Sequence, residues 1–208
     1  MRMFESNFKA ILANFTSDQS LINKLWTEVI FHYNKHDRHY HTLQHLDHLL
    51  KELSPIQDKI ADWQVVVLAI AYHDIIYNPL KQDNEEKSAA LAHERLNLLN
   101  IAPDRSAKCK ALIAATKSHS QSTDSDINYF IDADLAILGN SYFSYKKYTE
   151  QIRKEYSIYP DILYKPGRQK VLQHFLQMPT IYKTMYFIEK YEQQARNNIA
   201  YELQELQK

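Results

Sequence analysis

Six of the 10 histidines lie in one short stretch: His32, His36, His39, His41, His45 and His48. On an α-helix of 3.6 residues per turn, His41, His45 and His48 share one face beside a stripe of leucines. Imidazole nitrogen is a common ligand of divalent transition metals. This face could therefore hold a metal ion or a phosphate, although a chance cluster on a partly exposed helix edge would look the same.

Acidic residues interrupt two of the most apolar segments of the chain. Asp74 follows His73 near the end of the run 61–77, where burial of a carboxylate is costly unless a partner compensates it. An acid at a helix C-terminus also meets the unfavourable end of the helix dipole. Asp132 and Asp134 interrupt the segment IDADLAIL (131–138). Either could be a helix cap, but two acids in one apolar segment favour a ligand for a cation.

Glycine usage limits the fold that positions these residues. Only Gly139 and Gly167 occur among 208 residues, whereas an average usage of about 7% gives roughly fifteen. Rossmann, P-loop and kinase-type phosphate loops need clustered glycines and are excluded. Low glycine also disfavours a turn-rich all-β chain.

Helical periodicity dominates the sequence, and one all-α domain over residues 1–208 is expected. The first helix follows the N-cap candidates Ser17 and Asp18, and later ones begin at Asp83 or Asn84 and at Pro103. The other expected helical or apolar segments are 41–53, 61–77, 128–138, 141–157, 167–176 and 181–206. We expect the C-terminal helices (about 141–206) to pack on the bundle core.

Charge and composition exclude several classes of function. Lys and Arg (25) balance Asp and Glu (25), so no electrostatic footprint for duplex nucleic acid is present. The single cysteine, Cys109, excludes an internal disulfide framework and a multi-cysteine zinc site, and its helical spacing predicts a core position. The N-terminal segment is too interrupted by polar residues for a secretory signal, and no apolar run reaches the length of a membrane span. The expected location is cytoplasmic, without a membrane partner.

Three ordered motifs resemble the HD superfamily of metal-dependent phosphohydrolases: YHTLQHLDHLL (40–50), AYHDIIYNP (71–79) and IDADLAILG (131–139). More narrowly, they resemble an uncharacterised bacterial group of predicted HD-superfamily phosphohydrolases, which DNEEKSA (83–89), ATKSH (115–119), IRKEY (152–156) and ARNN (195–198) also match. The resemblance runs from about residue 25 to near the C-terminus. It implies an HD-domain helical bundle.

The resemblance also implies a metal site. Its ligands would be His45, His73, Asp74 and Asp134, with Mn, Fe, Co, Ni, Mg or Zn admissible as the divalent ion. The first motif is similar to that of cyclic-nucleotide phosphodiesterases, which implies His45 as the ligand and His41 as the general acid. Asp134 is preferred to Asp132 because its ADL tripeptide fits the last motif better, and Asp134 would also orient or deprotonate the attacking water.

The implied activity is hydrolysis of a phosphomonoester or phosphodiester by metal-activated water. The expected substrate is a nucleotide or a related small phosphorylated molecule. His119 resembles the extra histidine of HD enzymes that bind two metals or a substrate phosphate, although a loop histidine at a helix end needs no function. The candidate substrate-binding residues are Arg38, Glu85, Lys117, Arg153, Tyr156 and Arg168. The alternative is a non-catalytic nucleotide-binding or regulatory HD module, because fold does not dictate function.

Overall fold

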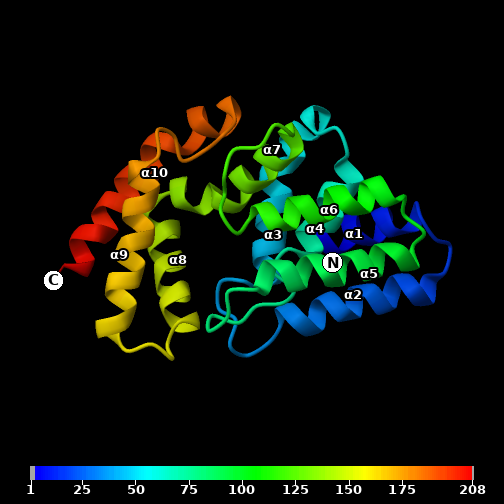
Figure 1. Cartoon of the computed structure of the whole chain (residues 1–208), viewed down its shortest axis with the longest axis horizontal. Helices are drawn as coiled ribbons and strands as arrows, with labels where there is room; N and C mark the ends of the chain where they lie inside the picture. Colours follow the sequence, from blue (N-terminus) through cyan, green and yellow to red (C-terminus); the bar gives the residue numbers. More distant parts are fainter. Residues whose placement is uncertain (1–2, 208) are drawn as a thin grey trace. The chain divides into compact units, whose positions relative to one another are not determined.

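The computed structural model describes residues 3–207, and all regular structure within them is helical (Figure 1). The predicted all-α class is therefore confirmed. The α-helices are α1 (Met3–Ala13), α2 (Gln19–Tyr33), α3 (Leu43–Leu53), α4 (Trp63–Tyr72), α5 (Asn84–Leu98), α6 (Pro103–Ala115), α7 (Ser125–Leu135), α8 (Tyr142–Glu155), α9 (Asp161–Gln177) and α10 (Met185–Leu206). Two 3₁₀ helices, η1 (Ser54–Lys59) and η2 (Ala136–Gly139), complete the order.

The chain divides into two compact units, a first unit up to Ile131 and a second unit from Asp132. Each is described separately below. The packing of the C-terminal helices on the bundle core stays a prediction.

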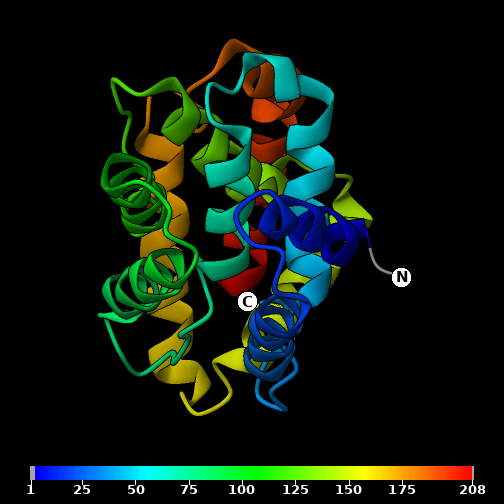
Figure 2. The ribbon, with the colours of Figure 1, turned by 90° about the vertical axis from the view of Figure 1, so that its right-hand side faces the viewer.

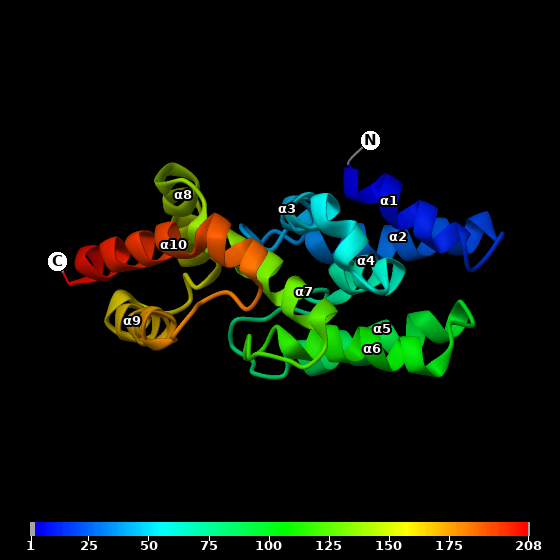
Figure 3. The ribbon, with the colours of Figure 1, turned by 90° about the horizontal axis from the view of Figure 1, so that it is seen from above.

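Helix α4 is the centre of the first unit. It packs against α1, α3, α5 and α6 (Figure 3), and every residue from Val65 to Tyr72 is at most 1% exposed. Such burial on all sides agrees with its almost uninterrupted apolar sequence. Asp62 caps its start by accepting the Val65 N–H, and Arg105 of α6 holds the same carboxylate through two 2.7 Å bonds.

Helix α4 ends at Tyr72, five residues before the predicted end at residue 77. The backbone after it is held by other elements: the Asp74 N–H donates to the Tyr33 hydroxyl, and the Ile75 carbonyl accepts from Arg38. The Ile76 N–H donates to Ser88. These bonds replace the next helical turn, so His73 and Asp74 lie in a turn and not within a helix.

Two further corrections concern the N-terminal half. Helix α3 begins at Leu43 with Thr42 as its N-cap, so His41 lies outside the helix that was expected to start at residue 41. Helix α1 was not predicted, although its buried Phe4, Phe8 and Leu12 have helical spacing. It packs on α2, α3 and α4 (Figure 2), and its Phe4 N–H donates to Asp47.

In the second unit, α10 packs against α9 and η2. Gly139 is needed at this contact, because an added Cβ would lie 2.7 Å from the Tyr191 carbonyl oxygen. Helix α9 starts at Asp161, six residues before the predicted start at residue 167, and continues through Pro166. Pro166 is exposed and costs one backbone hydrogen bond, while Arg168 and Leu172 of the same helix are held in the interior of the unit.

Among residues 3–207, none of the helices combines the length and the apolar character that crossing a bilayer requires.

Candidate metal centre

Three side chains of the first unit converge on one point. His45 comes from the first turn of α3, while His73 and Asp74 come from the turn that ends α4. The two Nε2 atoms are 3.1 Å apart, and Asp74 Oδ2 lies 3.0 Å from His73 Nε2 and 3.7 Å from His45 Nε2. Both imidazoles are almost fully buried, at 3% and 1% exposure, whereas the Asp74 side chain is 17% exposed. The cluster therefore consists of two buried imidazoles and one carboxylate that is partly accessible to solvent.

The other ring nitrogen of His73 determines what its Nε2 can do. Nδ1 lies 3.0 Å from the Ile70 carbonyl oxygen, which accepts hydrogen bonds only. Nδ1 therefore carries a proton, and in the neutral form of the ring Nε2 presents its lone pair toward Asp74. In that form, two acceptor atoms face each other across 3.0 Å.

The donor set and the separations fit a divalent ion. Ligand atoms about 2.0–2.2 Å from an ion stand about 3.0–3.5 Å apart in tetrahedral or cis-octahedral arrangements. The two shorter separations, 3.1 Å and 3.0 Å, fall in this range, and the third is slightly longer at 3.7 Å. A second proton, on His73 Nε2, would allow a hydrogen bond in only one of these contacts. A cation between the three atoms would interact favourably with all of them. Two imidazoles and a carboxylate suit borderline metals such as Mn, Fe, Co, Ni and Zn.

His41 stands at the edge of this cluster. Its Nε2 lies 3.8 Å from Asp74 Oδ2, and its ring centroid lies 5.6 Å from that of His45. Because His41 precedes α3, the predicted one-turn helical spacing from His45 is wrong, yet the loop brings the two rings together. The ring of Tyr77 packs on His41 at 4.4 Å between centroids.

The two acids of the third motif have different surroundings. Asp132 is fully buried and accepts from the Lys183 N–H (2.7 Å), the Thr184 N–H (2.8 Å) and the Thr184 hydroxyl (2.7 Å). Burial raises the pKa of Asp132 to about 6, against the opposing effect of these donors. Asp132 thus fastens the segment before α10. Asp134, two residues on, projects about 200° around the same helix, is partly exposed, and stays a predicted ligand.

The predicted substrate-binding residues of the second unit form intramolecular networks. Arg153 donates to the Asp161 carboxylate and to the carbonyls of Tyr156 and Tyr159, which closes the turn between α8 and α9. Arg168 forms a fork with Glu202 at 2.8 Å and 3.0 Å. For these residues a substrate contact stays a prediction, while a structural role is observed.

The remaining predicted residues lie in the first unit. The Lys117 ammonium binds the Glu86 carboxylate and the Gln82 carbonyl on the surface. Glu85 lies in the first turn of α5 and is partly exposed. His119 follows α6 with a φ of 50°, a left-handed conformation that histidine adopts more readily than most residues. Their proposed roles stay predictions.

Arg38 is buried beside the cluster, at 5% exposure. Its guanidinium donates hydrogen bonds to the carbonyl oxygens of His41 and Ile75. Sequence analysis missed its neighbours Tyr33 and Tyr77, and also Phe130, whose ring meets His73 edge-on at 5.8 Å. Tyr77 is only four residues after His73, and this short separation in sequence could have indicated that it lies near the cluster. Cys109 is fully buried as predicted, and burial raises its pKa to about 12, so it is unsuited to act as a nucleophile.

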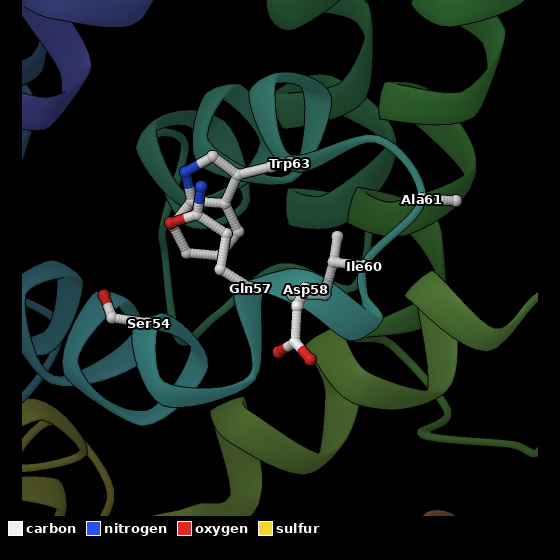
Figure 4. Close-up of a pocket in the computed structure, with 6 residues that line it drawn as sticks. All are labelled: Ser54, Gln57, Asp58, Ile60, Ala61 and Trp63. Carbon is white, nitrogen blue, oxygen red and sulfur yellow. The ribbon is translucent and has the colours of Figure 1, made fainter.

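A hollow of about 600 Å³ opens elsewhere on the first unit, between η1 and the start of α4. It is lined by Ser54, Gln57, Asp58, Ile60, Ala61 and Trp63. Figure 4 shows the Asp58 carboxylate pointing away from the Trp63 indole. The hollow contains none of the predicted site residues and is separate from the cluster.

Comparisons with family models, with curated proteins and with solved structures gave no match to this chain.

Proposed function

We propose that this protein is a divalent-metal phosphohydrolase of the HD type that cleaves a small phosphomonoester or phosphodiester, such as a nucleotide. The observation that carries the proposal is the convergence of His45 Nε2, His73 Nε2 and Asp74 Oδ2, with the His73 lone pair directed at the carboxylate. The three motifs of the sequence support the same assignment.

Asp134 is the proposed fourth ligand. Asp132 is a poor alternative, because Lys183 and Thr184 already use its carboxylate. This argument supports the choice that the ADL tripeptide suggested.

A divalent ion in this cluster would lower the pKa of a water molecule and polarise a phosphoryl oxygen. The protein's own residues would do the rest. His73 and His45 would remain neutral and buried, and the exposed edge of Asp74 would face the reacting groups. His41, at the rim, would hold a proton on Nε2 for the leaving oxygen, a role that suits imidazole near neutral pH.

The test is metal content and turnover in matched variants. Protein purified without chelator should carry close to a full equivalent of a transition metal by mass spectrometry. It should also hydrolyse p-nitrophenyl phosphate or its bis-ester in added Mn²⁺ or Ni²⁺. His73→Ala and Asp74→Ala should lose metal and activity together. His93→Ala is the control, because His93 is partly buried in the same unit and bonds to Ser106 away from the cluster.

The outcomes are distinct. Metal and activity retained in both His73→Ala and Asp74→Ala would contradict the ligand assignment. A metal-loaded protein that binds nucleotides in calorimetry without turning them over would favour the regulatory alternative.

A further inference from the structure

Arg38 connects the two segments that carry the cluster. Its Nη1 donates to the His41 carbonyl at 3.2 Å, and its Nη2 donates to the Ile75 carbonyl at 2.9 Å. His41 is two residues before α3, which carries His45, and Ile75 directly follows Asp74. One planar guanidinium therefore bonds to both sides of the cluster.

The charge of Arg38 is compensated without a carboxylate. Its guanidinium carbon lies 4.7 Å from the centroid of the Tyr33 ring and 5.4 Å from that of Tyr77. Within residues 3–207 it forms no ion pair. A cation at 5% exposure is expensive to bury, so two carbonyl dipoles and two aromatic faces must offset that cost.

The two tyrosines that pack on Arg38 also contact both segments of the cluster. The Tyr33 hydroxyl accepts the Asp74 N–H at 3.2 Å, and the Tyr77 ring packs on His41. The side chain that fixes the backbone on both sides of the cluster thus also rests on the two rings that contact Asp74 and His41.

We propose that Arg38 is a positioning residue that sets the distance between the His41–His45 segment and the His73–Asp74 turn. The effect on metal binding rests on the proposed function, whereas the effect on the backbone does not. A rigid guanidinium fork holds two acceptors at a defined separation, which a flexible ammonium does not. Arg38 acts through the cluster, and a direct substrate contact is not needed to explain its burial.

The experiment compares Arg38→Met with Arg105→Met. Arg105 also forms a fork in the first unit, on Asp62, but away from the cluster, so its loss controls for general destabilisation. Co²⁺ affinity and the Co²⁺ absorption spectrum are measured without substrate, and amide hydrogen exchange is measured on the metal-free proteins. A residue that only binds substrate would change neither.

Arg38→Met should weaken Co²⁺ binding by about 10–100-fold, as loss of a supporting contact behind a ligand does. It should also change the Co²⁺ spectrum and speed up exchange in residues 34–42 and 73–78. Arg105→Met should leave all three unchanged.

Two results would overturn the positioning role or its fork argument, and a third would refute the proposed function alone. Equal exchange in these segments of Arg38→Met and Arg105→Met would overturn the positioning role. Full recovery of affinity in Arg38→Lys would overturn the fork argument. A wild-type protein that binds no Co²⁺, while Arg38→Met still speeds up exchange, would refute the proposed function and leave the positioning role standing.

Discussion

The Arg168–Glu202 cluster of the second unit and the His73–Asp74 cluster of the first unit pair their buried polar side chains in different ways. In the second unit, Arg168 meets Glu202 through two donor–acceptor bonds of 2.8 Å and 3.0 Å, and Tyr145 donates to the same carboxylate. In the first unit, the neutral form of His73 presents a lone pair to the Asp74 carboxylate 3.0 Å away. One cluster pairs donors with acceptors, and the other brings acceptors together.

This difference separates structural motif residues from candidate functional ones. A buried polar network in which donors meet acceptors stabilises a particular packing. Acceptors that converge instead need a cation or protons from outside the network. The difference therefore supports a stabilising role for Arg168 and the proposed ligand role of His45, His73 and Asp74, and separate variants test the two roles.

The largest effect is expected at the rim of the acceptor cluster. His41→Ala should leave the metal in place and slow turnover by about 10²–10⁴-fold, because a general acid is lost. His45→Ala should lower metal content, because a ligand nitrogen is lost. Metal analysis with steady-state kinetics checks both. Loss of metal in His41→Ala with retention in His45→Ala would reverse the two roles.

Removal of one partner from the donor–acceptor cluster should mainly affect stability. Arg168→Met leaves Glu202 buried without its cation, which costs about 3–5 kcal/mol for a buried pair. Urea unfolding should show this loss, while metal content per folded protein stays unchanged. Lys87→Met is the control, since its pair with Asp83 is exposed and should contribute little. A loss of metal in folded Arg168→Met would break the division between the units.

Asp132 and Asp134 test the same distinction, between a structural residue and a proposed metal ligand, within one helix. Asp132→Ala removes a charged acceptor from two N–H groups and a hydroxyl and should cost about 1–3 kcal/mol in the free energy of unfolding. Asp134→Ala should lower metal affinity, because the proposed fourth ligand is lost. Thermal unfolding and metal titration of both variants check the pair, and the reverse pattern would make Asp132 the ligand.

The smallest effect concerns His32, next to Arg38. Burial, then Lys35 and Arg38, lower the pKa of His32, and these effects outweigh the opposite influence of Glu28. The unfolded chain therefore binds more protons than the folded one just below the ordinary pKa of about 6.5. The His32 contribution to stability should be present above that pH and be lost as pH falls through the lowered pKa. Urea unfolding against pH should show a flatter slope in His32→Gln, and an unchanged slope would contradict the assignment.

The sequence was most informative where side-chain pattern and capping agree. Asp18 caps α2 as expected, accepting from the Ser20 and Leu21 N–H groups, and Pro103 begins α6. The end of α4 and the start of α9 were misplaced: α4 ends at Tyr72, well before Pro79, and α9 begins at Asp161 and continues through Pro166. The turn after Tyr72 is held by Tyr33, Arg38 and Ser88, which are distant in sequence from it.

The candidate site was predictable in its side-chain types but not in its supports. The three motifs named His45, His73 and Asp74, which the structure brings together. Arg38 was predicted only as one of several candidate substrate-binding residues. Its burial between Tyr33 and Tyr77 depends on tertiary contacts that no local pattern reveals.

The most direct test of the central claim is anomalous diffraction at the cobalt edge from crystals grown with Co²⁺. One peak is expected at the cluster, about 2.0–2.2 Å from the Nε2 atoms of His45 and His73 and from an Asp74 carboxylate oxygen. A peak elsewhere on the molecule with none at this cluster would contradict the metal centre.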